Sequence, residues 1–133
     1  MIPGSTPLYI AAQEGHSDVV EQLLSRSADI ECVFRDGYTP LYIAAQNGRV
    51  EVVKTLLAKG ANREASCKCF ILSVKVLLPI LIRLPNLGSH GSTPLYIACQ
   101  QGQLEVAKVL LEAKCNIEAV FKTGFTPLYV AAR

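Results

Sequence analysis

Cysteine and histidine are the residues of this 133-residue chain that could hold a metal ion. Cys67, Cys69 and His90 supply three candidate zinc ligands. Structural zinc sites need a further ligand and usually place about two to four residues between paired cysteines. A single residue separates Cys67 from Cys69, and no fourth ligand accompanies them. The sequence therefore predicts no metal site and no cofactor.

Residue combinations for nucleophilic or phosphoryl-transfer chemistry are also missing. The two histidines are His16, beside a predicted turn, and His90, and neither belongs to a Ser-His-Asp arrangement. No glycine-rich loop that could cradle a phosphate is present. We therefore expect a protein without catalytic activity.

Composition narrows the class of protein further. Half of the residues are hydrophobic and 18% are charged, which favours a folded domain or short repeat array over a disordered tail. A net charge of +2 and 7% aromatic residues without tryptophan argue against a nucleic-acid partner. Five cysteines, an odd number, and no signal peptide predict reduced thiols and a cytoplasmic location.

An internal repeat organises the chain. The string Thr-Pro-Leu-Tyr begins at Thr6, Thr39, Thr93 and Thr126. The first and last intervals are 33 residues, and the middle one, 54 residues, exceeds this period by 21. Three further features recur in the same register. An Ala-Ala-Gln or Ala-Cys-Gln segment stands at 11–13, 44–46 and 98–100. A single glycine follows at Gly15, Gly48 and Gly102, and a Leu-Leu pair stands at 23–24, 56–57 and 110–111.

Local chemistry predicts two helices in each unit. Thr6 can cap a helix that starts at Pro7, and Gly15 can end it in the left-handed region. A second helix is expected over 17–26, with its valines and leucines on one face. The residue after that helix is Ser27, Gly60 or Lys114, and a left-handed Lys114 would cost about 1 kcal/mol.

A 33-residue unit with these features resembles the ankyrin repeat. The resemblance implies an all-α solenoid of stacked antiparallel helix pairs with projecting hairpin loops. It covers residues 1–133 as one domain, with repeats at about 6–38, 39–65 and 87–125 and a partial repeat at 126–133. Because the partial repeat stops inside its first helix, we expect a fragment of a larger protein.

Some positions depart from the family pattern. A tyrosine replaces the common histidine of the first helix, and we expect its ring to pack inside the array. A glutamate replaces the common asparagine near the repeat end, and Cys99 and Cys115 take the places of alanines that we expect to be buried. The tyrosines are Tyr9, Tyr42, Tyr96 and Tyr129, and the glutamates are Glu31, Glu64 and Glu118.

An insertion at 66–86 interrupts the period. It carries three basic residues and no acid, and without it the net charge would be −1. Lys75, Pro79 and Arg83 interrupt its apolar run, which argues against a membrane-spanning helix. A contact with a membrane surface or a partner, a passive loop and translated non-coding sequence stay open. We expect the segment to fold back on the array or to be poorly ordered.

The resemblance also implies a partner-binding surface. Ankyrin arrays usually hold a partner protein in a concave groove between hairpin tips and first helices. This maps onto Gln13, Glu14, Val33, Arg35, Asp36, Tyr38, Gln46, Asn47, Gln100, Gln101, Val120, Lys122, Thr123 and Phe125. Phe34 and Phe121, beside these valines, either anchor a partner or pack between adjacent hairpins.

The predicted function is a non-catalytic scaffold that binds another protein through this groove. The rival is a membrane-associated module that uses 66–86, which Pro79 and Pro85 disfavour because they interrupt any long amphipathic helix. A regulatory array within a larger signalling protein is a further alternative.

Overall fold

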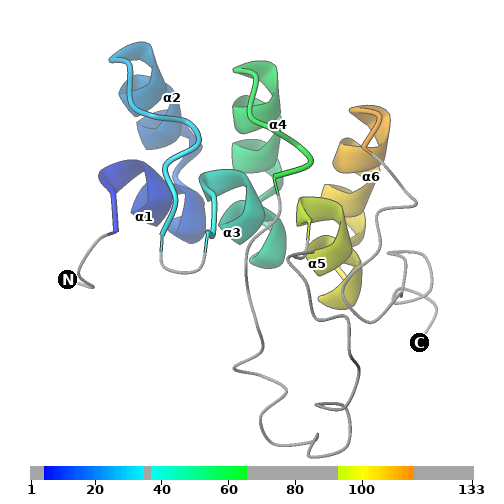
Figure 1. Cartoon of the computed structure of the whole chain (residues 1–133). Helices are drawn as coiled ribbons and strands as arrows, with labels where there is room; N and C mark the ends of the chain where they lie inside the picture. Colours follow the sequence, from blue (N-terminus) through cyan, green and yellow to red (C-terminus); the bar gives the residue numbers. More distant parts are fainter. Residues whose placement is uncertain (1–4, 35–36, 66–92, 116–133) are drawn as a thin grey trace, which may run out of the picture.

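The computed structural model describes residues 5–34, 37–65 and 93–115. These ranges contain three helix pairs: α1 (Pro7–Glu14) with α2 (Ser17–Ser25), α3 (Pro40–Gln46) with α4 (Val50–Ala58), and α5 (Pro94–Gln100) with α6 (Leu104–Glu112). The pairs stand side by side in a row (Figure 1). The first helices α1, α3 and α5 contact one another in sequence, and so do α2, α4 and α6. The expected all-α solenoid is confirmed.

Each first helix begins at a threonine cap followed by proline. The hydroxyl oxygen of Thr6 accepts a hydrogen bond from the Tyr9 backbone N–H at 3.1 Å. Thr39 and Thr93 accept the equivalent bonds at 3.2 Å. The proline that follows has no N–H to leave unsatisfied, and its fixed φ suits the first turn. The predicted helix starts are therefore confirmed.

A glycine in the left-handed region separates the helices of each pair. Gly15, Gly48 and Gly102 have φ angles of 88°, 68° and 69°. The second helices start without a side-chain cap, at His16, Arg49 and Gln103. The first of them ends at Ser25, one residue before the predicted end.

Each second helix is followed by another left-handed residue. Its φ angle is 64° at Ser27, 88° at Gly60 and 60° at Lys114. A side chain with a Cβ atom is strained in this region by about 1–2 kcal/mol. The strain predicted at Lys114 is therefore present, and Ser27 shares it.

The core lies between the two layers of helices. Alanines at the middle of the first helices are almost fully buried, which lets neighbouring first helices approach closely. Leucines and valines of both layers fill the remaining space. The rings of Tyr9, Tyr42 and Tyr96 are buried, as predicted. Cys115 is buried and Cys99 is half-buried.

A hairpin connects the first pair to the second at the base of the row, between α1 and α3 (Figure 1). The backbone N–H of Phe34 donates to the Tyr38 carbonyl at 2.9 Å, and the backbone N–H of Tyr38 donates to the Phe34 carbonyl at 3.0 Å. Gly37 inside this loop has a φ of 94°, which favours glycine. The insertion at 66–86, the partial repeat at 126–133 and Glu118 lie outside the described residues.

Candidate interaction surface

Six of the predicted partner-binding residues lie at the same end of the three first helices. They come in adjacent pairs at equivalent positions of successive repeats: Gln13 with Glu14, Gln46 with Asn47, and Gln100 with Gln101. The side chains of Gln13 and Gln46 are half-buried, and the other four are exposed. We call these six residues the helix-end row. The row presents amide and carboxylate groups to solvent.

The backbone beneath the helix-end row is held by the following repeat. Arg49 Nε donates to the Gln13 carbonyl at 3.1 Å, and Gln103 Nε2 donates to the Gln46 carbonyl at 3.3 Å. Asn47 Nδ2 adds a longer bond of 3.4 Å to the Gln13 carbonyl. These bonds fix the spacing between neighbouring helix ends. These bonds were not predicted, although a long polar donor follows the glycine at 49 and at 103.

The hairpin places two adjacent apolar residues very differently. Val33 is 61% exposed, whereas Phe34 is 7% exposed. The Phe34 ring packs on Tyr9 with centroids 4.9 Å apart and ring planes at 45°. Phe34 is therefore buried against α1, which disfavours its role as a partner anchor; packing between adjacent hairpins, the other alternative, stays a prediction. Val33 remains available to a partner.

Tyr38 is the other described hairpin residue of the predicted surface. Its ring is half-buried and lies 5.2 Å, centroid to centroid, from the ring of Tyr42 at 49°. Because Tyr42 belongs to the core, Tyr38 contributes to packing as well as to the surface. A substitution at Val33 therefore tests binding without disturbing the core, which a substitution at Tyr38 would affect.

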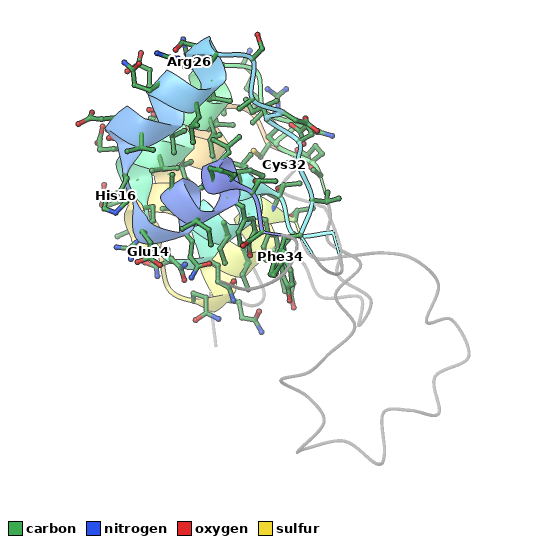
Figure 2. The ribbon with its side chains drawn as sticks, turned by 90° about the vertical axis from the view of Figure 1, so that its left-hand side faces the viewer. Glu14, His16, Arg26, Cys32 and Phe34 are labelled. Atoms are coloured by element: carbon green, nitrogen blue, oxygen red, sulfur yellow. The ribbon has the colours of Figure 1, made fainter. Side chains whose placement is uncertain are left out.

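The predicted surface forms two groups at opposite ends of the first helices. Figure 2 shows Glu14 at one end of α1 and Phe34 near the other. At about 1.5 Å per residue, the eight residues of α1 separate these ends by roughly 12 Å. A partner must therefore lie along the first helices to contact both groups. Six predicted residues lie outside the described ranges: Arg35, Asp36, Val120, Lys122, Thr123 and Phe125.

A second contact between repeats was not predicted either. The Glu31 carboxylate accepts the Asn62 backbone N–H at 2.6 Å, which joins the first hairpin to the turn after α4. Cys32 Sγ lies 3.0 Å from the Thr6 hydroxyl, within hydrogen-bond distance. The sequence feature that could have indicated the Glu31 contact is the glutamate that recurs at positions 31 and 64. These contacts stiffen the hairpin that carries Val33.

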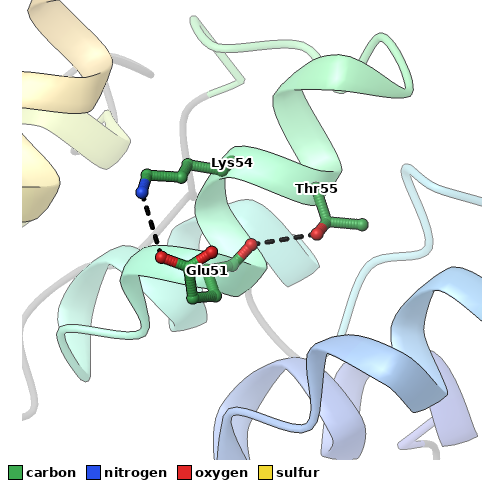
Figure 3. A network of polar contacts seen from close by, with 3 residues as sticks. All are labelled: Glu51, Lys54 and Thr55. Carbon is green, nitrogen blue, oxygen red and sulfur yellow. Dashed lines mark hydrogen bonds and ion pairs between the residues drawn. The ribbon is translucent and has the colours of Figure 1, made fainter.

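The opposite side of the array carries exposed charges on the second helices. Lys54 forms an ion pair with Glu51 at 3.0 Å, and Thr55 donates to the Glu51 carbonyl (Figure 3). Lys108 and Glu105 repeat the ion pair at 2.9 Å. All four charged side chains are more than half exposed, so each pair contributes little to stability. This side offers a matched control surface.

The thiols of the three described cysteines, Cys32, Cys99 and Cys115, are held in the protonated state. Burial raises the pKa of Cys115 to about 11, with a further upward contribution from Glu64. Burial also raises the pKa of Cys99 and of Cys32, where the Thr6 hydrogen bond opposes it. Neutral thiols are poor nucleophiles and poor metal ligands.

Among residues 5–34, 37–65 and 93–115, no group of three or more His, Cys, Asp or Glu side chains is placed to hold a metal ion. Cys67, Cys69 and His90 lie outside these ranges. None of the helices in the described part of the chain has the length and apolar character needed to cross a bilayer. Membrane contact through 66–86, and a regulatory role in a larger signalling protein, stay predictions.

Comparison with known proteins gives the repeat its family. Residues 3–69 and 64–133 match the family model for ankyrin repeats in three copies. The ankyrin repeat and KH domain-containing protein 1 of Homo sapiens is 45% identical over 47 residues, 35% of this chain and 2% of that protein. The ankyrin repeat and KH domain-containing protein mask of Drosophila melanogaster is 43% identical over 47 residues, 35% of this chain and 1% of that protein.

Alpha-latroinsectotoxin-Lt1a of Latrodectus tredecimguttatus is 44% identical over 50 residues, 37% of this chain and 4% of the toxin. The chain thus matches between 1% and 4% of the length of these relatives. Ankyrin repeats generally serve as protein–protein interaction modules and are typically non-catalytic. The family match extends over both halves of the sequence, and the helix pairs repeat in the matching register, so the chain belongs to the ankyrin repeat family.

Proposed function

We propose that this chain binds another protein along its first helices, between the hairpin that carries Val33 and the helix-end row. The observation that carries the proposal is the recurrence of exposed polar side chains on a fixed backbone. Glu14, Asn47 and Gln101 occupy one position in successive repeats and all are exposed. The carbonyls of Gln13 and Gln46 beside them are already bonded to the next repeat.

A fixed backbone favours binding because little conformational entropy is lost when a partner docks. Amide side chains both donate and accept hydrogen bonds, so Asn47 and Gln101 suit the polar and peptide groups of a protein surface. Val33 adds an apolar contact at the other end of the first helices. The partner expected from this arrangement has an apolar side chain about 12 Å from a stretch of polar groups.

The test compares two sets of substitutions on opposite sides of the array. Natural protein fragments are displayed, selected on the immobilised wild-type chain and then purified. Their affinities are measured for a partner-surface variant, Val33→Asp with Asn47→Arg, and for a control variant, Lys54→Ala with Lys108→Ala. All four positions are exposed, so both variants should keep the helical circular dichroism of the wild type.

The expected result is a loss of affinity of about tenfold or more for the partner-surface variant and an unchanged affinity for the control. Binders that tolerate the partner-surface variant and lose affinity for the control would place the interaction on the second helices and overturn the proposal.

A further inference from the structure

Helix α3 is capped at its C-terminal end by an asparagine, Asn47, and Gly48 follows it directly. The other three asparagines of the sequence, at 62, 86 and 116, precede arginine, leucine and isoleucine. The carbonyl carbon of an asparagine amide can react with the backbone nitrogen of the next residue to close a five-membered ring. Glycine hinders this reaction least because it has no Cβ. Asn47 Cγ and the Gly48 nitrogen are therefore the two atoms best suited to it.

The equivalent positions of the other described repeats lack this chemistry. Glu14 and Gln101 hold the place of Asn47, and each is followed by a glycine. The Glu14 carboxylate has no amide nitrogen to lose. The Gln101 side chain is one methylene longer, so its amide would have to close a less favourable six-membered ring. Among these three helix ends, the reaction is confined to the one in the middle of the row.

The folded backbone keeps the two reacting atoms apart. Asn47 has a ψ of 5°, so the Gly48 nitrogen eclipses the backbone nitrogen of Asn47. Ring closure requires it to eclipse Asn47 Cβ instead, because reacting atoms must approach to about 3–3.5 Å. The Gly48 N–H also donates to the Ala45 carbonyl at 3.3 Å, which holds the proton that the attacking nitrogen must lose. A rotation of the backbone at Asn47 must therefore precede the reaction.

Contacts with both neighbouring repeats oppose that rotation. Towards the first repeat, Asn47 Nδ2 and Arg49 Nε donate to the Gln13 carbonyl at 3.4 and 3.1 Å. Towards the third, Gln103 Nε2 donates to the backbone of α3 at 3.3 Å. The Gln103 side chain also lies against Gly48, where an added Cβ would be 2.8 Å from Gln103 Cδ. The backbone at Asn47 can turn only when these contacts open.

We propose that Asn47 is a site of spontaneous deamidation and that the stacking of the three helix pairs controls its rate. The Gly48 nitrogen loses its proton to hydroxide and forms a bond to Asn47 Cγ. The bond from Cγ to Nδ2 breaks, and Nδ2 takes a proton from water and leaves as ammonia. Water then opens the cyclic imide, at Cγ to give aspartate or at the main-chain carbonyl carbon to give isoaspartate. Solvent is the only other reactant.

Either product weakens the boundary between repeats that delays its formation. A carboxylate at position 47 cannot donate to the Gln13 carbonyl, and its charge lies beside that carbonyl oxygen. Isoaspartate also adds a methylene to the main chain, which disturbs the bonds that Gly48 and Arg49 donate to α3. The modified chain should therefore unfold at a lower urea concentration than the unmodified chain.

The test measures modification at each asparagine in the folded and in the unfolded chain. The purified chain is incubated in mildly alkaline buffer, with and without guanidinium chloride, and peptide mass spectrometry follows the loss of each amide. In denaturant, Asn47 should react faster than the asparagines at 62, 86 and 116. In buffer, its rate should be lower by about tenfold or more, because a reaction of the open form follows the population of that form.

Variants at the boundary test the control by stacking. In buffer, Arg49→Ala and Gln103→Ala should each modify Asn47 about fivefold faster than the wild type. In denaturant they should match it, and this rate corrects for any direct effect on the chemistry. Lys54→Ala, an exposed site on α4, is the matched control and should keep the wild-type rate in both conditions.

Three results would each overturn the proposal. The first is an equal rate at Asn47 with and without denaturant, because the fold would then give no protection. The second is a faster reaction at another asparagine in denaturant. The third is an unchanged rate in buffer for both Arg49→Ala and Gln103→Ala, because the contacts between repeats would then not control the reaction.

Discussion

Arg49 Nε donates a hydrogen bond to the main-chain carbonyl of Gln13 across the boundary between the first two repeats, at 3.1 Å. Gln103 makes the same contact with Gln46 across the next boundary. The residue at this place in the first repeat is His16, which is exposed and whose side chain makes no cap hydrogen bond to α2. The donor of this hydrogen bond between repeats is an arginine in one case and a glutamine in the other, whereas the acceptor is a main-chain carbonyl in both. We call these two hydrogen bonds the polar ties.

Removal of this tie should weaken the stacking of the first two repeats. We expect Arg49→Ala to lower the free energy of unfolding by about 1 kcal/mol, because the Gln13 carbonyl keeps only the longer bond from Asn47 and the Arg49 stem no longer covers the helix end. Urea denaturation measures the change. His16→Ala is the matched control and should stay within about 0.5 kcal/mol of the wild type. Equal losses for the two variants would mean that the bond contributes nothing.

Gly48 and Gly102 permit a double-mutant test of the second tie. Both have φ near 68°, so an alanine costs a similar backbone strain of about 1–2 kcal/mol at either site. A Cβ at Gly48 would also lie 2.8 Å from Gln103 Cδ, whereas one at Gly102 meets no described atom within 4 Å. We expect Gly48→Ala to destabilise more than Gly102→Ala by about 1 kcal/mol.

The Gln103→Ala background provides the control for this pair. With the Gln103 side chain shortened, the two glycine substitutions should cost the same within about 0.5 kcal/mol. A difference that persists in this background would show that the extra cost at Gly48 does not come from the tie. Equilibrium unfolding of all variants under one condition supplies the comparison.

Lys114 holds a left-handed conformation that Gly60 adopts without strain in the preceding repeat. Lys114→Gly should therefore raise the free energy of unfolding by about 1 kcal/mol. The reverse exchange, Gly60→Lys, should lower it by a similar amount, because no described atom lies within 4 Å of the added Cβ and the cost is confined to the backbone. Thermal unfolding of both variants checks the signs. A Lys114→Gly variant that melts below the wild type contradicts the prediction.

The buried thiol of Cys115 should make stability depend on alkaline pH. Its pKa rises in the folded state from the ordinary 9.0 to about 11, so the native protein retains a proton that the unfolded chain releases. The stability contributed by the neutral thiol is complete below pH 9.0 and is lost as pH rises towards about 11. Alanine holds this position in the first two repeats, so Cys115→Ala should fold and should lose stability less steeply in this range.

Urea midpoints measured for both proteins between about pH 8 and pH 11 provide the test, because tyrosine and lysine titrations are common to the two and cancel in the difference. Parallel pH profiles would show that the Cys115 thiol titrates alike in the folded and unfolded states.

Local structure could be predicted because single residues determine it. Thr6 followed by Pro7 specifies a capped helix start, and Gly15 specifies its end, whatever lies beyond them in space. The strain at Lys114 followed from alignment with Gly60. These features depend on a few neighbouring backbone angles, which the sequence of a few residues constrains.

Contacts between repeats could be predicted only in part. Whether Phe34 faces solvent or Tyr9 depends on how the hairpin folds back on α1, and both alternatives suit an aromatic residue beside Val33. The bond from Arg49 to Gln13 involves a backbone acceptor, which leaves no mark in the sequence of the accepting residue. The exposure of single positions was missed for a similar reason: Val19 and Val52 are the same residue type at equivalent positions, yet Val19 is 47% exposed and Val52 is 1% exposed.

The two polar ties differ in the length of chain that each closes. Arg49 reaches its acceptor across 36 residues, and Gln103 reaches its own across 57. Loop-closure entropy grows only with the logarithm of chain length, so the longer connection costs about 0.4 kcal/mol more. A longer connection therefore lowers the free energy of unfolding only slightly. It slows folding instead, since contacts between residues that are distant in the sequence form more slowly. The first two helix pairs should therefore pack together early in folding, and the third pair should pack on them afterwards.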